Sequence, residues 1–133
     1  MTIAKDEHSA TDALAIVEKY EGFVHYLYPI LQNAPRKHGV LRDAVLTALF
    51  APIGDLYHAA KSKQLSRLYA LDAELATLRA FLRLLAQANI RVITPKQHEI
   101  ALGHIAQAGR MLNAWIKKLR SSEASLRKGQ TGS

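Results

Sequence analysis

Six basic residues in the second half of the chain have types and spacings that could bind phosphate groups. They are Arg79, Arg83, Arg110, Lys117, Lys118 and Arg120. Positions four or seven apart return to nearly the same side of a helix, so Arg79 lies with Arg83, and Arg110 lies with Lys117. Guanidinium and ammonium groups bind phosphate oxygens through charge-assisted hydrogen bonds, and arginine also pairs with acids across subunit boundaries. Spacing alone favours neither use.

The positive charge of the chain is concentrated toward its C-terminal end. The sequence has 18 Lys and Arg against 11 Asp and Glu, a formal net charge of +7. Residues 1–93 contain 11 basic and 9 acidic residues, whereas residues 94–133 contain 7 basic and 2 acidic ones. A cationic surface attracts polyanions, although basic surfaces also occur on proteins that never bind them. The charge therefore indicates RNA or DNA as a partner.

Residues that carry catalysis or bind metals do not form a known motif. Di-metal sites in helical bundles need Glu-x-x-His pairs on different helices, and only Asp55 with His58 has a comparable spacing. The six histidines form no HxxxH or HExxH pattern, the seven glycines form no phosphate-binding loop, and cysteine is absent. We therefore expect no enzymatic activity, no metal, no cofactor and no small-molecule substrate.

The composition favours a single all-helical domain. In 133 residues the hydrophobic fraction is 49% but the aromatic fraction is only 7%, which suits helices rich in Leu and Ala better than strands. The sequence contains neither a leader-like apolar run nor an apolar stretch of 18 residues. We expect a soluble, cytoplasmic protein with no membrane partner.

Apolar periodicity predicts four helices, and the first two are joined by a basic turn. The first helix covers 11–32 and the second covers 40–61, with Pro and Gly in the segment between them. The residues expected to face inward on the second helix are Leu46, Leu49, Ile53, Leu56 and Ala60. Pro52 lacks an amide hydrogen and costs about 3 kcal/mol inside a helix, so we predict a kink or a short break near Pro52 and Gly54.

The third and fourth predicted helices cover 66–88 and 95–120. Leucines repeat at three-four spacing through the third, and the fourth begins with a capping box in which Thr94 is the N-cap and Gln97 its partner. Short connections make successive helices antiparallel neighbours. The sequence thus predicts an antiparallel up-down four-helix bundle over 11–120, preceded by a polar segment at 1–10 and followed by a flexible basic tail at 121–133.

A strip of small residues on the fourth helix indicates a contact with another subunit. Gly109 costs about 1 kcal/mol relative to Ala in a helix interior, and close approach by another helix would justify that cost. We predict an oligomer interface at Gly109, Asn113 and Ile116. Aromatic residues at helical spacing, namely Tyr20, Tyr26, Tyr28 and Trp115, are expected in the core or an interface rather than stacked on bases.

Three ordered segments resemble one protein family. They are YLYP at 26–29, LRAFLRLL at 78–85 and GRMLNAWIK at 109–117. Together they resemble the Avd family, the accessory variability determinant proteins of diversity-generating retroelements, and the resemblance covers about residues 15–118. More distantly, the chain is similar to the four-helix bundle proteins encoded in intervening sequences of ribosomal RNA. Pro52 with Gly54, and Asn113-Ala114 before the tryptophan, depart from the family pattern.

The resemblance implies a homopentameric barrel of bundles that binds nucleic acid and the reverse transcriptase of the retroelement. It also implies support for mutagenic retrohoming, with no catalysis by the accessory protein. Carried over by position, Arg79, Arg83, Arg110 and Lys117 become the favoured basic contacts. Two alternatives remain: a structural helical oligomer whose basic residues pair between subunits, and a role like that of the intervening-sequence proteins.

Overall fold

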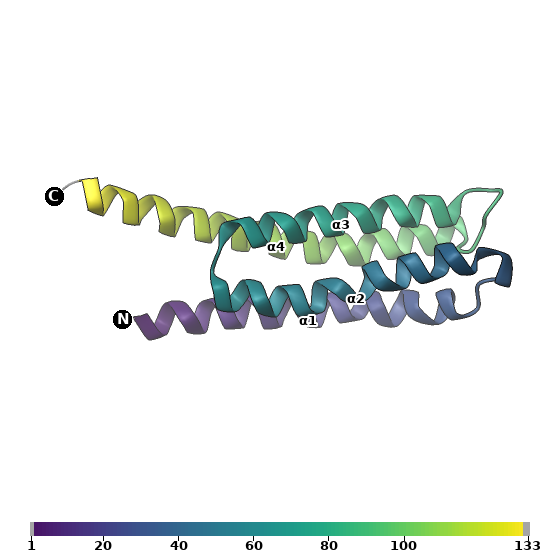
Figure 1. Cartoon of the computed structure of the whole chain (residues 1–133), viewed down its shortest axis with the longest axis horizontal. Helices are drawn as coiled ribbons and strands as arrows, with labels where there is room; N and C mark the ends of the chain where they lie inside the picture. The colour runs from purple at the N-terminus through teal and green to yellow at the C-terminus, as the bar shows by residue number, and fades with distance from the viewer. Residues whose placement is uncertain (1, 132–133) are drawn as a thin grey trace.

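The computed structural model describes the backbone of residues 2–131 and the side-chain surroundings of residues 11–127. Four long helices make up this region: α1 (Thr2–Gln32), α2 (Gly39–Ser62), α3 (Leu65–Ala86) and α4 (Pro95–Thr131), with a 3₁₀ turn, η1 (Arg36–His38), before α2. Successive helices run in opposite directions, and α1 also packs against α4 (Figure 1). The described residues contain no strand. The predicted all-α, four-helix architecture is confirmed.

The predicted leucine stripe forms the inner side of α3. Its members, Leu68, Leu71, Leu75, Leu78, Leu82 and Leu85, are all buried. Each fully buried leucine contributes roughly 1.5–3 kcal/mol relative to an exposed one. Tyr20 and Trp115 also lie in the core, whereas Tyr28 is 38% exposed and stays accessible to a partner. None of the helices within the described residues has the length and apolarity needed to cross a membrane.

The inner side of α2 differs from the prediction. Its buried residues are Val45, Leu49, Pro52, Leu56 and Ala59. Leu46, Ile53 and Ala60, which we expected to face inward, are only partly buried at the edge of the core. The expectation was wrong for these three because two apolar stripes run side by side on α2, and the stripe that contains Pro52 is the one that faces the core.

Pro52 does not interrupt α2, so a break at this position is excluded. The helix continues from Gly39 to Ser62 with the proline inside it, and its ribbon changes direction about midway along its length (Figure 1). One turn earlier, the buried Tyr20 hydroxyl of α1 donates a hydrogen bond of 2.5 Å to the Leu49 carbonyl. Burial, together with the nearby Glu74 carboxylate, raises the pKa of Tyr20, so the hydroxyl keeps its proton. This bond joins α1 to α2 close to the site where proline removes an amide donor.

The start of α4 has the predicted capping box. The Thr94 amide donates to Gln97 Oε1 at 2.9 Å, and the Gln97 amide donates to Thr94 Oγ1 at 3.1 Å. Each side chain therefore satisfies one backbone donor that the first turn of the helix leaves free. This reciprocal pair fixes where α4 begins.

Two helices are longer than the sequence predicted. Helix α1 begins at Thr2 rather than near Thr11, and α4 continues past Arg120 to Thr131, through most of the expected flexible tail. The last two residues of that tail lie outside the described residues. The physical reason is the absence of helix breakers in both extensions, because neither proline nor glycine occurs between Thr2 and Gly22 or between Gly109 and Gly129.

Candidate nucleic-acid interface

The contact between α3 and α4 brings Arg79 against Gly109. A Cβ atom added to Gly109 would lie 2.9 Å from Nη2 of Arg79, which is closer than carbon and nitrogen tolerate. Glycine therefore makes room for the half-buried arginine of the same chain, and a subunit contact at Gly109, Asn113 and Ile116 stays a prediction. Ile116 is likewise buried in the core, at 6% exposure. Asn113 is the one member of the predicted interface that is left exposed.

Three further cations lie on the same two helices. Arg110 directly follows Gly109 on the exposed side of α4, and Lys117 lies two turns farther along the same helix, a distance of about 10 Å. Arg83 is exposed on α3, one turn beyond Arg79. Within the described part of the chain, none of Arg79, Arg83, Arg110 and Lys117 forms an ion pair. We call these four residues the α3–α4 basic face.

The other two predicted cations have partners inside the molecule. Lys118 Nζ lies 3.4 Å from Oδ1 of Asp12 and ties α4 to α1. Such a solvated pair contributes about 0–1 kcal/mol, but it offsets the charge that Lys118 offers to a ligand. Arg120 donates to the Tyr69 hydroxyl from Nε at 2.8 Å and from Nη2 at 2.5 Å, and its guanidinium lies 5.6 Å from the ring centroid. The six predicted cations thus fall into two groups. Four of them, which we call open, form no ion pair among the described residues, and two, Lys118 and Arg120, which we call engaged, contact a side chain of the same molecule.

The last turns of α4 extend beyond the α2–α3 connection (Figure 1). A groove next to Lys117 is lined by this part of α4. Its volume is about 770 Å³. The lining includes the apolar residues Trp115, Leu119 and Leu126 and the polar residues Lys117, Lys118 and Ser121. Sequence periodicity did not predict this groove, because it depends on the extension of α4 past Arg120.

An acidic pair at the α2–α3 contact was also missed. Burial, and then the neighbouring carboxyl of Asp55, raise the pKa of Glu74 to about 7. The signal in the sequence is weak, because each residue is a single acid next to a buried leucine and the only motif-like spacing links Asp55 with His58. Among the described residues, no three His, Asp or Glu side chains come together as metal ligands.

The sequence of the bundle matches one known family. The match is to the bAvd-like family and extends over residues 14–119, from α1 through nearly all the packed part of α4. The chain belongs to the bAvd-like family. This confirms the resemblance inferred from the segments at 26–29, 78–85 and 109–117, all of which lie in the matched range. A search of curated proteins finds no match.

The sequence departs from the family pattern at two places, and the structure shows where each of them lies. Pro52 and Gly54 are accommodated inside a continuous α2. Asn113 and Ala114 are both exposed on α4, next to the buried Trp115. Neither departure disturbs the α3–α4 basic face, because that face is built from other positions.

Proposed function

We propose that this chain is a non-catalytic accessory protein of a diversity-generating retroelement. In this role it binds nucleic acid, associates with the reverse transcriptase of the element and supports mutagenic retrohoming as a homopentamer. Family membership supports the role. The observation that carries nucleic-acid binding is the α3–α4 basic face, whose four cations make no ion pair among the described residues.

The proposed mechanism works by position and charge. Lys and Arg neutralise phosphates and release condensed counterions, so binding is independent of sequence and weakens as salt rises. Four open cations per copy are few for a stable complex. Five copies on one strand would raise the overall affinity, because each further contact becomes intramolecular. Assembly and nucleic-acid binding therefore support each other.

The decisive experiment reverses the charge of the basic face. Glu is introduced together at Arg79, Arg83, Arg110 and Lys117, and binding of labelled RNA and co-purification with the reverse transcriptase are measured. We expect nucleic-acid binding to be lost, while circular dichroism shows unchanged helical content. A matched control introduces Glu at four exposed cations elsewhere, Lys19, Arg36, Lys37 and Arg67, and so makes the same change in net charge. Retained binding in the first variant would contradict the site.

The same variant separates this proposal from the structural alternative. If the four cations pair with acids of another subunit, charge reversal should dissociate the oligomer, and the wild-type protein should bind RNA without dependence on salt. Light scattering after size exclusion measures the mass of the oligomer, and an RNA titration at several salt concentrations measures the salt dependence of binding. Gene neighbourhood distinguishes the proposed function from a role like that of the intervening-sequence proteins. A reverse transcriptase gene and a pair of repeats should lie beside this gene only if it belongs to a retroelement.

A further inference from the structure

The groove beside the last turns of α4, which we call the α4 groove, brings together three parts of the chain. Asp12 comes from α1, Lys63 from the connection between α2 and α3, and the other lining residues from α4 between Trp115 and Leu126. Lys63 is the C-cap of α2, and its amide donates to the Ala59 carbonyl at 2.9 Å. This cap fixes the backbone of Lys63 at the turn between the two helices. The packed end of the bundle therefore builds the groove together with α4.

The surface inside the α4 groove is mostly apolar. Leu126 is 59% exposed, and Leu119 is partly buried at the edge of the core. Trp115 stays in the core, with 3% of its surface exposed. Ligand pockets have volumes of about 300–1,000 Å³ and are lined mainly by apolar side chains, and the groove has both properties. Attraction of phosphates by lysine and arginine gives no reason for this apolar surface.

Lys117 belongs both to the α4 groove and to the α3–α4 basic face. A strand whose phosphates contact this open cation therefore passes beside the groove. Bases without a complementary strand bury their flat, weakly polar faces against protein side chains, whereas the bases of a duplex are paired and stacked on one another. Only a single strand can offer a base to the groove.

We propose that the α4 groove binds an unpaired base of the nucleic acid whose phosphates contact the α3–α4 basic face. This rests on the nucleic-acid binding in the proposed function, and it adds a second type of contact and a preference for single strands. Leu119 and Leu126 cover the face of the base, and Lys117 contacts a phosphate beside it. Trp115 remains a core residue next to the base and does not stack on it.

The polar residues of the α4 groove suit the edge of a base. Ser121 and Ser122 carry hydroxyls that donate and accept, and the Glu123 carboxylate accepts from amino groups such as the one guanine presents. The other acid of the lining, Asp12, already pairs with Lys118 at 3.4 Å. The lining contains three lysines against two acids, so its net charge does not repel a polyanion.

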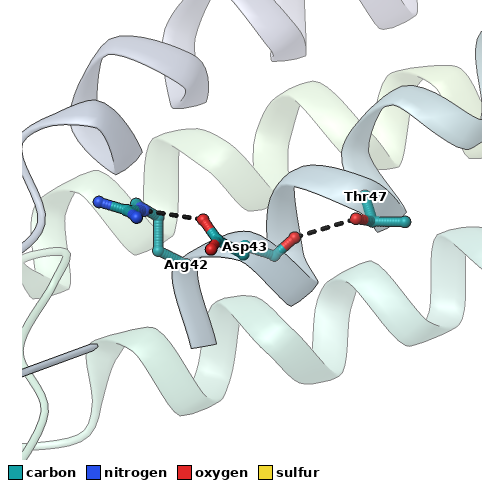
Figure 2. A network of polar contacts seen from close by, with 3 residues as sticks. All are labelled: Arg42, Asp43 and Thr47. Atoms are coloured by element: carbon teal, nitrogen blue, oxygen red, sulfur yellow. Dashed lines mark hydrogen bonds and ion pairs between the residues drawn. The ribbon is translucent and has the colours of Figure 1, made fainter. Parts of the chain in front are cut away.

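The exposed aromatic pair of α1 and α2 offers apolar surface in a different setting. Tyr28 and Phe50 are 38% and 45% exposed, and their ring centroids lie 5.7 Å apart. The basic residue of α2 nearest to Phe50 in sequence is Arg42, and Figure 2 shows its guanidinium bound to Asp43 at 3.0 Å. The Thr47 hydroxyl is occupied as well, because it donates to the Asp43 carbonyl at 3.1 Å. Of these two apolar surfaces, the α4 groove is the one that adjoins an open cation on its own helix.

The single tryptophan of the chain gives a direct readout of the α4 groove. Trp115 is part of the lining, so a base bound there should change its fluorescence. The probes are a short single-stranded RNA and the same strand annealed to its complement. We expect the single strand to quench Trp115 fluorescence as it binds. The duplex should bind through its phosphates and leave the fluorescence unchanged.

A matched pair of substitutions tests the apolar contact. Leu126→Gln replaces an exposed leucine of the α4 groove with a good helix former, and Leu14→Gln makes the same change at an exposed leucine of α1 outside it. Circular dichroism should show unchanged helical content in both variants. Leu126→Gln should weaken binding of single-stranded RNA about fivefold without changing the slope of its salt dependence, because an apolar contact is lost and every open cation is kept. Leu14→Gln should bind as wild type does.

The proposal is overturned if single-stranded RNA binds without changing the fluorescence of Trp115, or if Leu126→Gln binds it as tightly as wild type. If that variant keeps its RNA affinity but no longer co-purifies with the reverse transcriptase, the groove belongs to a protein segment instead. These outcomes leave salt-dependent binding through the basic face standing. A wild-type protein that binds neither RNA would contradict the nucleic-acid binding in the proposed function as well.

Discussion

Lys117 and Lys118 are adjacent in sequence, but the structure predicts different roles for them in RNA binding. Lys117 is exposed and forms no ion pair among the described residues, whereas Lys118 Nζ lies 3.4 Å from an Asp12 carboxylate oxygen. A cation that already has an acidic partner releases fewer phosphate counterions when RNA binds. Lys117→Gln should therefore weaken RNA binding and reduce its dependence on salt, whereas Lys118→Gln should change both only slightly.

The magnitude follows from the number of open cations. For single-stranded RNA the logarithm of affinity falls with the logarithm of salt concentration with a slope of about −0.7 per neutralised phosphate. Four contacts per copy give a slope of about −2.8, so raising salt from 50 to 200 mM should weaken wild-type binding about 50-fold. Lys117→Gln leaves three contacts, and the same change in salt should weaken its binding about 20-fold.

Fluorescence anisotropy of a short labelled RNA at several salt concentrations measures these slopes directly. A short strand is required because a long one contacts several copies and adds their slopes together. If the salt dependence of RNA binding had the same slope in Lys117→Gln and Lys118→Gln, the different roles assigned to these two lysines would be refuted. A wild-type affinity that does not change with salt would refute the electrostatic mechanism altogether.

Three further substitutions test individual contacts between the helices of the bundle. Gly109→Ala should stabilise α4 by up to about 1 kcal/mol in thermal unfolding, because the crowded atom is the movable end of Arg79, and it should weaken RNA binding by displacing that guanidinium. Glu74→Gln should gain stability over wild type by about 1 kcal/mol between pH 4 and pH 8 in denaturant titrations. The reason is that a carboxyl whose pKa is raised to about 7 favours the folded state below its ordinary pKa, and this advantage is lost as pH rises through 7. Tyr20→Phe should lose about 1 kcal/mol with the bond to the Leu49 carbonyl, whereas the control Tyr26→Phe should lose little.

Features that depend on neighbours in sequence were predictable. The capping box of Thr94 and Gln97 involves two residues three positions apart, and both of its hydrogen bonds form as expected. The leucine stripe of α3 likewise follows from helical periodicity alone. Such patterns need no knowledge of which helix packs where.

Features that depend on contacts between helices were not predictable in the same way. Gly109 lies against Arg79, thirty positions earlier, and helical periodicity within α4 carries no information about this contact with α3. On α2, two apolar stripes had similar strength, and only the packed bundle shows that the one containing Pro52 faces inward. The acidic pair of Asp55 and Glu74 is also a contact between two helices.

The proposed assembly would repeat the α3–α4 basic face once in every copy. Arg79 and Arg83 of α3 and Arg110 and Lys117 of α4 belong to one chain, so each copy carries the complete set of these cations. A strand long enough to reach two copies would bind its second basic face at an effective concentration in the millimolar range, with no new contact required. The gain in affinity from assembly therefore depends on the length of the RNA and not on additional cations.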